Sequence, residues 1–573
     1  MKNKETKVPG RFSRREFLLS TTLASAGLVS FGCKKNNFFG QETGAPGDEG
    51  DHLPDIAGMT VKGTVQCNGV GVPGVVVSDG VEVTTTDAGG IYYLPSAKTK
   101  GFVFISVPGG YDVATVNTIL PVFYHAFKAK ASVVETMNFT LTKADNDKYV
   151  VLALGDMHLA DRNNDIAQFQ KGFLPDARET IARYQQMGYK VYGLTLGDMT
   201  WDSYWYSNQY SFAQYLSVMK NMNIPVFHTM GNHDNNPYVA ADWAAEADFR
   251  ASLGPTYYSF NLGKVHYIVL DNVEYVNKGG AEGKLGERNY NKVIAADQIA
   301  WLKKDLATIT DKNTPVILAM HIHLNSNPSA LETASLNLTN AADLIDCFSG
   351  FSNVNVLTGH THICYAYENS SSLMEHNSGA VCATWWWTGK NGYAGNQVCK
   401  DGAPGGYAIW KFNNTDYQWL YKAIGYDESY QFRAYDLNQV HITAANYAPA
   451  ATDALLSGYA GAYATKNTGN EILVNVWGYD KRWKVELFEN GVTPLAVTRV
   501  KEKDPLHIIS YEALRLNAGA TPTADFCTIA SAHLFKARAT GPASTVLIKV
   551  TDRFGNVYTE MMTRPKALTV SMK

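Results

Sequence analysis

Histidine, aspartate and asparagine residues recur in five short segments of the sequence, each directly after an apolar run. The segments are Gly155-Asp156-Met157-His158, Gly197-Asp198, Gly231-Asn232-His233-Asp234, His321-Ile322-His323 and Gly359-His360-Thr361-His362. Imidazole nitrogens with carboxylate and amide oxygens favour Mn, Fe, Zn or Ni, and burying such groups together without cations would be costly. The pattern therefore predicts a metal site assembled from several loops.

The apolar runs before these segments have the length and composition of buried strands. They cover residues 150–154, 191–196, 224–230, 316–320 and 354–358. Between them, apolar residues recur at helical spacing, as in Phe173, Ala177, Ile181 and Tyr184. Alternating strands and helices indicate an α/β domain, and ligand sites in open α/β sheets lie beyond the carboxyl ends of the strands. All five segments have that placement.

Any one of these segments has a structural explanation, because a lone histidine is commonly a hydrogen-bonded core residue and an isolated Gly-Asn-His-Asp can cap a helix. Their shared order and position argue for a single site. In that order they resemble the motifs of the calcineurin-like metallophosphoesterase superfamily. The flanking segments resemble its bacterial exported subgroup, in which β-domains stand on both sides of the catalytic domain.

The resemblance implies a two-sheet sandwich with helices outside and two divalent or mixed-valence metal ions at one edge. By motif position, Asp156, His158 and His362 would bind the first ion, Asn232, His321 and His360 the second, and Asp198 would bridge both. In the purple acid phosphatase subgroup a tyrosine ligand stands three residues after the bridging aspartate. Trp201 occupies that position here, so iron–phenolate chemistry is not expected.

Two cations that share a water lower its pKa, so the expected nucleophile is a metal-bridging hydroxide that attacks phosphorus. The leaving oxygen then needs a proton. His233 stands beside the predicted ligand Asn232, and the resemblance also implies that His233 is the general acid, with Asp234 to orient it. The alternative is that His233 only stabilises charge.

Four further residues are candidates for substrate contact. His323 stands where the family often has proline, and it either serves the site or faces solvent. Asp202 follows the bridging Asp198 closely and either lines the pocket or packs. Trp385 and Trp387 flank Trp386 in a stretch continued by Gly389, Asn391 and Gly392, which predicts a platform for a sugar, base or lipid head group. Successive strand residues face opposite ways, so at least one of the three tryptophans is expected in the core.

The N-terminus has the pattern of an export signal. Ser13-Arg14-Arg15-Glu16-Phe17-Leu18 resembles a twin-arginine signal, and the apolar stretch that follows ends at Gly32-Cys33, which resembles a bacterial lipoprotein cleavage site. We therefore expect an exported periplasmic or outer-membrane lipoprotein of a bacterium, attached to the membrane only through a lipid on Cys33. The alternative is an uncleaved signal anchor.

The length of 573 residues implies several domains. The predicted order is an export signal (1–33), a flexible tether (34–56), an N-terminal β-sandwich (57–146), an α/β metallophosphoesterase domain (147–400) and a C-terminal all-β sandwich (401–573). In the last, residues 544–551 and 557–560 read as a hairpin. Cys382 and Cys399 either close a loop by a disulfide or are buried thiols.

A formal net charge of −3 gives no argument for nucleic acid or for a membrane surface as partner. The sequence predicts a two-metal hydrolase of phosphomonoesters or phosphodiesters, acting on a small-molecule, lipid or sugar phosphate. One alternative is a non-catalytic surface protein whose β-domains bind a glycan or a partner, and the complete ligand set argues against it. The other is a different metal-assisted hydrolase, against which only the resemblance argues.

Overall fold

The computed structural model of the chain describes residues 53–388 and 397–572. The predicted export signal, with Arg14, Arg15 and Cys33, lies outside the described residues, as do most of the predicted tether and Gly389, Asn391 and Gly392. Within the described ranges, no helix has both the length and the apolar character that crossing a membrane requires.

The N-terminal domain consists of short strands in two main sheets. Their bounds are β1 (Val61–Cys67), β2 (Val70–Gly71), β3 (Val76–Ser78), β4 (Val83–Thr85), β5 (Ile91–Leu94), β6 (Phe102–Ser106), β7 (Tyr111–Asp112), β8 (Thr115–Val116), β9 (Leu120–Pro121), β10 (Tyr124–Ala126), β11 (Glu135–Thr136) and β12 (Phe139–Lys143). One sheet has the order β11-β1-β12-β7, the other β10-β6-β3-β4. Alternate residues of β1 are buried, as expected for a strand with one face on a core.

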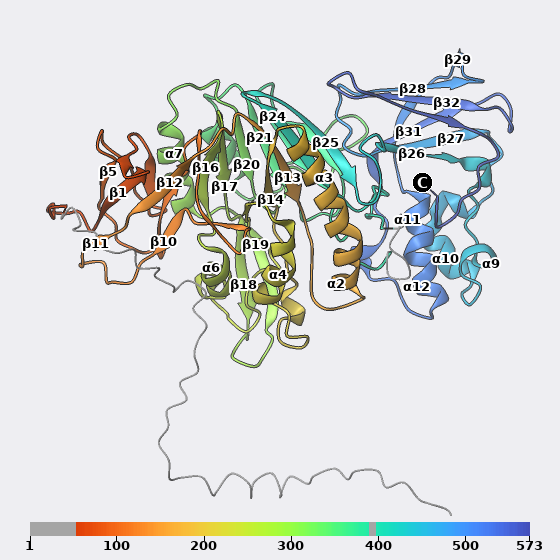
Figure 1. Cartoon of the computed structure of the whole chain (residues 1–573). Helices are drawn as coiled ribbons and strands as arrows, with labels where there is room; N and C mark the ends of the chain where they lie inside the picture. The colour runs from red at the N-terminus through yellow and green to blue at the C-terminus, as the bar shows by residue number, and fades with distance from the viewer. Residues whose placement is uncertain (1–52, 389–396, 573) are drawn as a thin grey trace, which may run out of the picture. The chain divides into compact units, whose positions relative to one another are not determined.

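The middle domain contains two mixed sheets. The first comprises β13 (Lys148–Leu154), β14 (Lys190–Thr195), β15 (Val226–Phe227), β24 (Gly406–Asn413) and β25 (Asp416–Ala423) in the order β15-β14-β13-β24-β25 (Figure 1). The second comprises β16 (Tyr258–Leu262), β17 (Val265–Val269), β20 (Val316–Ala319), β21 (Val354–Thr358), β22 (Tyr365–Glu368) and β23 (Leu373–Asn377) in the order β16-β17-β20-β21-β23-β22. The strands that lead into the five segments pair in parallel within each sheet.

Strand β13 shows how the core is divided, because it is buried on both faces. Tyr149 and Val151 belong to the core that includes side chains of the second sheet, and the Tyr149 hydroxyl lies 2.9 Å from that of Tyr267 on β17. Val150 and Leu152 instead join a second cluster with helix side chains. Burial on both faces is typical of parallel strands in a layered α/β fold, which confirms the predicted fold class.

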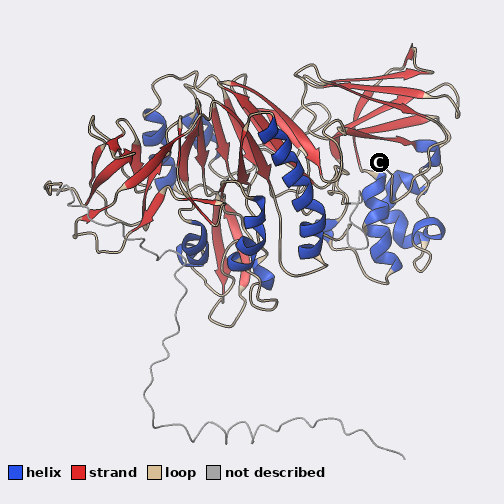
Figure 2. Ribbon diagram, in the orientation of Figure 1, coloured by secondary structure: helices blue, strands red, loops and turns tan. Residues whose placement is uncertain are grey.

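The helices of the middle domain pack against these sheets, as Figure 2 shows. They are α2 (Asp165–Gln168), a π-helical turn (Phe169–Phe173), α3 (Leu174–Gln186), α4 (Phe212–Met219), α5 (Asp242–Ala245), α6 (Ala247–Leu253), α7 (Ala296–Ala307) and α8 (Ala341–Cys347). The predicted stripe is correct, since Ala177, Ile181 and Tyr184 form the buried face of α3. A separate hairpin, β18 (Val273–Lys278) with β19 (Glu287–Lys292), projects from this domain.

Two strands of the middle domain lie beyond the predicted boundary at residue 400. Strand β24 pairs antiparallel with β13 from Lys148↔Asn413 to Ala153↔Ala408, and β25 pairs with β24. The first sheet therefore extends to Ala423. In the sequence, the β24–β25 hairpin cannot be distinguished from a hairpin of the C-terminal sandwich. The alternation of apolar and polar residues identifies a strand but not the strand with which it pairs.

The C-terminal domain contains two antiparallel sheets, as predicted. One comprises β26 (Phe432–Asp436), β27 (Glu471–Val476), β30 (Thr498–Glu502) and β31 (Ser531–Arg538), and the other β28 (Lys484–Glu489), β29 (Thr493–Pro494), β32 (Val546–Thr551) and β33 (Val557–Met562). The predicted hairpin is β32–β33. The expectation of an all-β domain is incomplete, because it also contains α9 (Ala444–Tyr447), α10 (Asp453–Ala460), α11 (Pro505–Ser510) and α12 (Glu512–Asn517).

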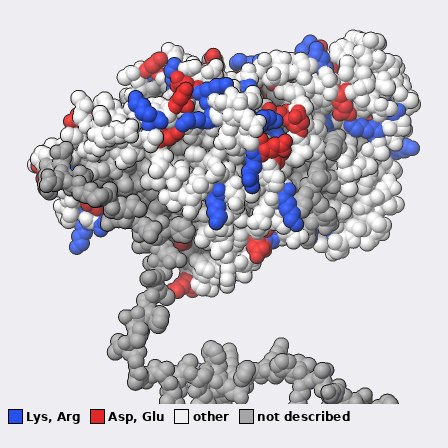
Figure 3. Space-filling model, in the orientation of Figure 1, with Lys and Arg blue, Asp and Glu red and all other residues white. Residues whose placement is uncertain are grey.

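The described cysteines are free thiols, so Cys382 and Cys399 are buried thiols and do not form a disulfide. On the surface seen in Figure 3, Lys and Arg side chains are interspersed with Asp and Glu. No broad single-sign patch on this face would attract a polyanion, in keeping with the small net charge.

Candidate metal centre

All seven predicted metal ligands come together beyond the carboxyl ends of the parallel strands. Asp156 and His158 follow β13, Asp198 follows β14, Asn232 follows β15, His321 follows β20, and His360 and His362 follow β21. Six of these side chains are buried and His360 is partly buried. Loops from both sheets thus meet at one place, and neither sheet alone supplies all seven candidate ligands.

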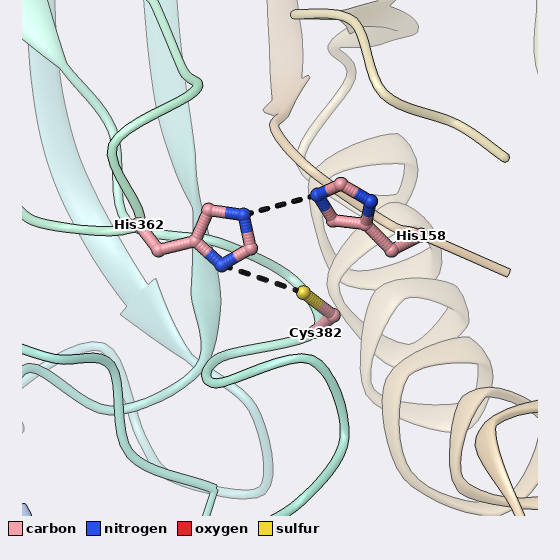
Figure 4. Close-up of side chains that lie close together, drawn as sticks. All are labelled: His158, His362 and Cys382. Carbon is pink, nitrogen blue, oxygen red and sulfur yellow. Dashed lines mark hydrogen bonds between the residues drawn. The ribbon is translucent and has the colours of Figure 1, made fainter. Parts of the chain in front are cut away.

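The first group of donors contains Asp156, His158 and His362. The Nε2 atoms of His158 and His362 lie 3.1 Å apart and point toward one another (Figure 4). Asp156 Oδ1 lies 3.3 Å from His362 Nε2 and 3.8 Å from His158 Nε2. Two imidazole nitrogens and a carboxylate oxygen that converge in this way can share one cation.

The second group contains Asn232, His321 and His360. His321 Nε2 lies 3.0 Å from Asn232 Oδ1 and 3.1 Å from His360 Nδ1. Asp198 connects the two groups, because its Oδ2 lies 3.1 Å from His321 Nε2 and 3.5 Å from His158 Nε2. One carboxylate therefore faces both donor sets, which is the position of a bridging ligand.

Backbone carbonyls fix which nitrogen of two histidines faces the site. His321 Nδ1 lies 2.7 Å from the Leu196 carbonyl, and His362 Nδ1 lies 2.7 Å from the Ala383 carbonyl. Each Nδ1 must donate to its carbonyl, so Nε2 is the nitrogen that faces the site and that would bind a cation. Such outer contacts orient metal-binding histidines and increase their basicity.

Cys382 also lies near this group, with Sγ 3.6 Å from His362 Nδ1 (Figure 4). It stands beside the nitrogen that already donates to a carbonyl, not beside the Nε2 that faces His158. Burial raises the pKa of the Cys382 thiol well above its usual range. We therefore assign Cys382 to packing behind His362 and not to the ligand set.

The backbone at the site is constrained. Five of the seven predicted ligands have left-handed φ values: Asp156 (52°), His158 (44°), Asp198 (52°), His360 (70°) and His362 (54°). Non-glycine residues rarely adopt this region, and clusters of them mark functional sites. Gly231 adds a close approach, since a Cβ there would lie 2.2 Å from the Asp198 backbone nitrogen.

The charges of the site favour a cation. Burial would raise the pKa of Asp198, but His321 and His233 hold that pKa well below its usual range. Burial lowers the pKa of His158 and of His360 well below the usual range for histidine. Burial also acts against the charge of His321, but the nearby Asp198 carboxylate raises the pKa of His321 to about 9. An anionic carboxylate among imidazole and amide donors fits metal ions of the predicted kind.

The structure places His233 next to the donors but gives it a different partner from the predicted one. Its backbone N–H donates to Asp198 Oδ1 (2.8 Å), and its ring Nδ1 lies 2.8 Å from Asp202 Oδ1. Asp202 Oδ2 in turn accepts a hydrogen bond from Arg288 Nη1 (2.7 Å). The prediction that Asp234 orients His233 is therefore wrong, because Asp202 does so.

Asp234 instead accepts hydrogen bonds from the backbone of two loops. Its Oδ2 accepts from the backbone N–H groups of Gly231 (3.0 Å) and Met199 (3.3 Å), and its Oδ1 accepts from the Thr200 N–H (3.1 Å). These contacts tie the Gly-Asn-His-Asp loop to the Gly-Asp loop. Asp234 is fully buried and forms no hydrogen bond with the His233 ring, so its role is to hold two ligand loops together.

A cleft of about 540 Å³ opens at the donors and contains three of the four predicted substrate residues. Asp202, His323 and Trp385 line it, whereas Trp387 is not among its lining residues. His323 is 9% exposed and one ring nitrogen lies 3.0 Å from the Asn337 amide, so it faces the cleft and not bulk solvent. Trp387 instead lies beside Arg162 and Arg515.

At least one tryptophan of this stretch is core, as expected, but the stretch consists of turns and not of a strand, so strand alternation is not the reason. Trp386 is 2% exposed, and its indole nitrogen donates to the Met157 carbonyl (2.8 Å). Trp385 stacks on the predicted ligand His362 with ring centroids 3.8 Å apart and planes at 15°. One tryptophan is therefore core and one belongs to the site.

Several residues of the cleft were not found from the sequence, among them Arg288, Tyr290, Lys400 and Asp525. Arg288 and Tyr290 arrive on β19, and the Tyr290 hydroxyl lies 3.0 Å from His360 Nε2. Lys400 follows the last motif, and Asp525 comes from the C-terminal domain. None of them belongs to a motif, so only the tertiary structure brings them to the site.

Three family models match the chain, and together they span most of it. Their descriptions are N terminal of Calcineurin-like phosphoesterase (residues 59–144), Calcineurin-like phosphoesterase (149–364) and C terminal of Calcineurin-like phosphoesterase (375–558). A search of curated proteins found no match.

Several solved structures resemble the chain at low identity. A dimetal phosphatase from Danio rerio is 12% identical, with 48% of this chain and 96% of that one covered and a TM-score of 0.34. A 5'-nucleotidase from Candida albicans is 12% identical, with 48% and 51% covered and a TM-score of 0.30. The NAD nucleotidase of Haemophilus influenzae is 11% identical, with 48% and 50% covered and a TM-score of 0.27.

Proposed function

We propose that this chain cleaves phosphate esters with two metal ions and with His233 as general acid. The chain is a calcineurin-like metallophosphoesterase with the N- and C-terminal domains of that family, and it is thus a metal-dependent hydrolase. The observation that carries the proposal is the position of Asp198. Its Oδ2 faces His321 Nε2 of one donor group and His158 Nε2 of the other. Each group offers nitrogen and oxygen donors without a thiolate, which suits Mn, Fe, Zn or Ni.

When bound, two such cations activate water and neutralise charge on the phosphoryl group. The protein's own part begins with the strand-end loops, which hold the donors in constrained backbone geometry before substrate arrives. His321 and His362 keep Nε2 toward the site because Nδ1 of each donates to a carbonyl. Preorganised donors of this kind need no rearrangement during the reaction.

His233 is placed to move a proton to the leaving oxygen. Its side chain is 29% exposed and lines the cleft, whereas its partner Asp202 is 2% exposed. Asp202 accepts the proton on Nδ1, so the proton available for transfer is on Nε2. Burial lowers the pKa of His233, but the Asp198 and Asp202 carboxylates outweigh it and raise that pKa. The raised pKa favours the protonated ring that a general acid needs.

The activity is tested with protein stripped of metal by a chelator and reloaded with Mn, Fe, Zn or Ni. We expect two ions per chain by elemental analysis, hydrolysis of phosphomonoesters or phosphodiesters, and loss of that activity on chelation. Sulfate esters and amides of the same alcohols or amines serve as controls. A protein that binds no metal, or that cleaves only the sulfate esters or amides, would contradict the proposal.

We also propose that the chain is exported as a bacterial lipoprotein, on the pattern of Arg14, Arg15 and Cys33 in the sequence. Replacing both arginines with lysine should leave precursor in the cytoplasm, and Cys33→Ala should release the mature protein from membranes. Cell fractionation measures both. Unchanged export in the first variant argues against the twin-arginine route, and unchanged membrane association in the second argues against lipidation.

A further inference from the structure

The cleft at the metal ligands is not made by the middle domain alone. Besides the donors it is lined by Trp385 and Lys400, and by Asp525 and Ile529 from the C-terminal domain. Its volume of about 540 Å³ lies in the range of pockets that hold whole small molecules, about 300–1,000 Å³. A phosphoryl group at the donors would therefore leave room for an organic group to contact these residues.

Trp385 forms a rigid part of the wall. Its ring stacks on His362 (3.8 Å, 15°) and on Phe526 of the C-terminal domain (4.1 Å, 18°). Because both stacking partners belong to the protein, the indole cannot turn without losing two ring contacts. The predicted open platform is thus better described as a fixed wall that begins at a metal ligand.

Lys400 lies at this wall, with Nζ 5.5 Å from the centre of the Trp385 ring. Among the described residues, one lysine and one arginine line the cleft, and they differ in their partners. Arg288 donates to Asp202 Oδ2 (2.7 Å) and to Ser203 Oγ (2.6 Å). Lys400 forms no side-chain hydrogen bond or ion pair with a described residue.

A partly buried cation without a counterion is costly, and a ligand anion would offset that cost. Burial lowers the pKa of Lys400, while Asp525 and other carboxylates act in the opposite direction. Asp525 lines the same cleft and is exposed, but it is not within ion-pair distance of Lys400. The lysine therefore has electrostatic neighbours but no direct partner among the described residues.

We propose that Lys400, at the wall formed by Trp385, binds a second anionic group of the substrate. The preferred substrate would then be a phosphate ester whose organic part carries another phosphate or a carboxylate. This inference rests on the proposed function, because the first phosphate must occupy the metal site. Asp525 opposes the second anion and limits the strength of the subsite.

The test compares esters that differ only in the second charge. Metal-loaded protein is given 4-carboxyphenyl phosphate, 1,4-phenylene bisphosphate and the uncharged analogue 4-carbamoylphenyl phosphate. We expect kcat/KM for the charged esters to exceed that for the neutral one by about 10-fold, the effect of one hydrogen bond to a charged group. The relative rates of the carboxylate and the bisphosphate identify which anion is preferred.

Variants assign the preference to Lys400. Lys400→Met should bring the charged-to-neutral ratio close to one, Lys400→Arg should retain it, and Asp525→Asn should increase it. The matched control is Lys484→Met, which removes an exposed lysine of β28 that does not line the cleft, and which should leave the ratio unchanged.

The possible failures are distinguishable. Equal rates for charged and neutral esters in the wild type, or an unchanged ratio in Lys400→Met, overturn the subsite and leave the proposed function intact. If Lys400 only screens the charge of Asp525, Asp525→Asn does not increase the charged-to-neutral ratio of kcat/KM, and that result also overturns the subsite. Hydrolysis of none of the three monoesters by metal-loaded wild type overturns the subsite, and hydrolysis of neither these monoesters nor phosphodiesters overturns the proposed function as well.

Discussion

Replacing Asp198 with asparagine should reduce turnover by orders of magnitude and weaken both metal sites. The same Asp198 oxygen lies 3.1 Å from His321 Nε2 and 3.5 Å from His158 Nε2, so it faces both donor groups. Its other oxygen accepts the His233 backbone N–H (2.8 Å). An amide keeps the shape but loses the charge that neutralises two cations, and one of its two ends can only donate.

The measurement is kcat/KM over rising metal concentration, together with the metal content of each protein. Asp112→Asn is the matched control, since it makes the same chemical change in a partly exposed ion pair with Lys190 away from the cleft. We expect the control to change activity little, because such surface pairs contribute at most about 1 kcal/mol to stability. Full activity of Asp198→Asn at saturating metal would show that Asp198 does not bridge.

The sequence could predict that the seven candidate ligands lie together, because the position of each one relative to its strand is local information. Each donor stands one to a few residues after an apolar strand, and parallel strands must deliver such loops to one edge of their sheet. The partners of His233 and His360 could not be predicted. Asp202, the partner of His233, is held by Arg288, and His360 is contacted by Tyr290. Arg288 and Tyr290 both come from the β18–β19 hairpin, whose residues carry no motif. The position of these two side chains depends on how the hairpin packs, and residue spacing in the sequence does not indicate that packing.

The prediction of one strand's length was wrong, and that of an all-β C-terminal domain was incomplete, in both cases for physical reasons. The predicted strand 224–230 is reduced to Val226–Phe227, because the next backbone donors bond to side chains: His228 N–H to the Tyr258 hydroxyl (2.9 Å) and Thr229 N–H to Thr195 Oγ1 (3.0 Å). In the C-terminal domain, α11 begins at Pro505 after Asp504, whose carboxylate accepts from the Leu506 and His507 N–H groups. That cap is a readable helix signal, but a six-residue helix is too short to show apolar periodicity.

His233→Ala should slow poor leaving groups far more than good ones. An alkyl phosphate needs a proton on its leaving oxygen, whereas an aryl phosphate with an acidic phenol barely does. General acid catalysis contributes about 10²–10⁴-fold, so the loss should approach that size for alkyl esters and shrink as the leaving-group pKa falls. The measurement is the mutant-to-wild-type ratio of kcat/KM across esters of graded leaving-group pKa, with metal content checked in each protein.

The structure adds a second variant that separates a proton donor from a charge stabiliser. Asp202 holds His233 Nδ1 at 2.8 Å, so Asp202→Asn should reproduce the leaving-group dependence in weaker form. Asp234→Asn is the contrasting change, because Asp234 bonds the loop backbone at Gly231 and Met199 and not the His233 ring. It should lower metal content and thermal stability and slow all esters alike. If His233→Ala instead gives a flat ratio, His233 only balances charge on the phosphoryl oxygens, and His323, which lines the same cleft, becomes the next candidate for the acid.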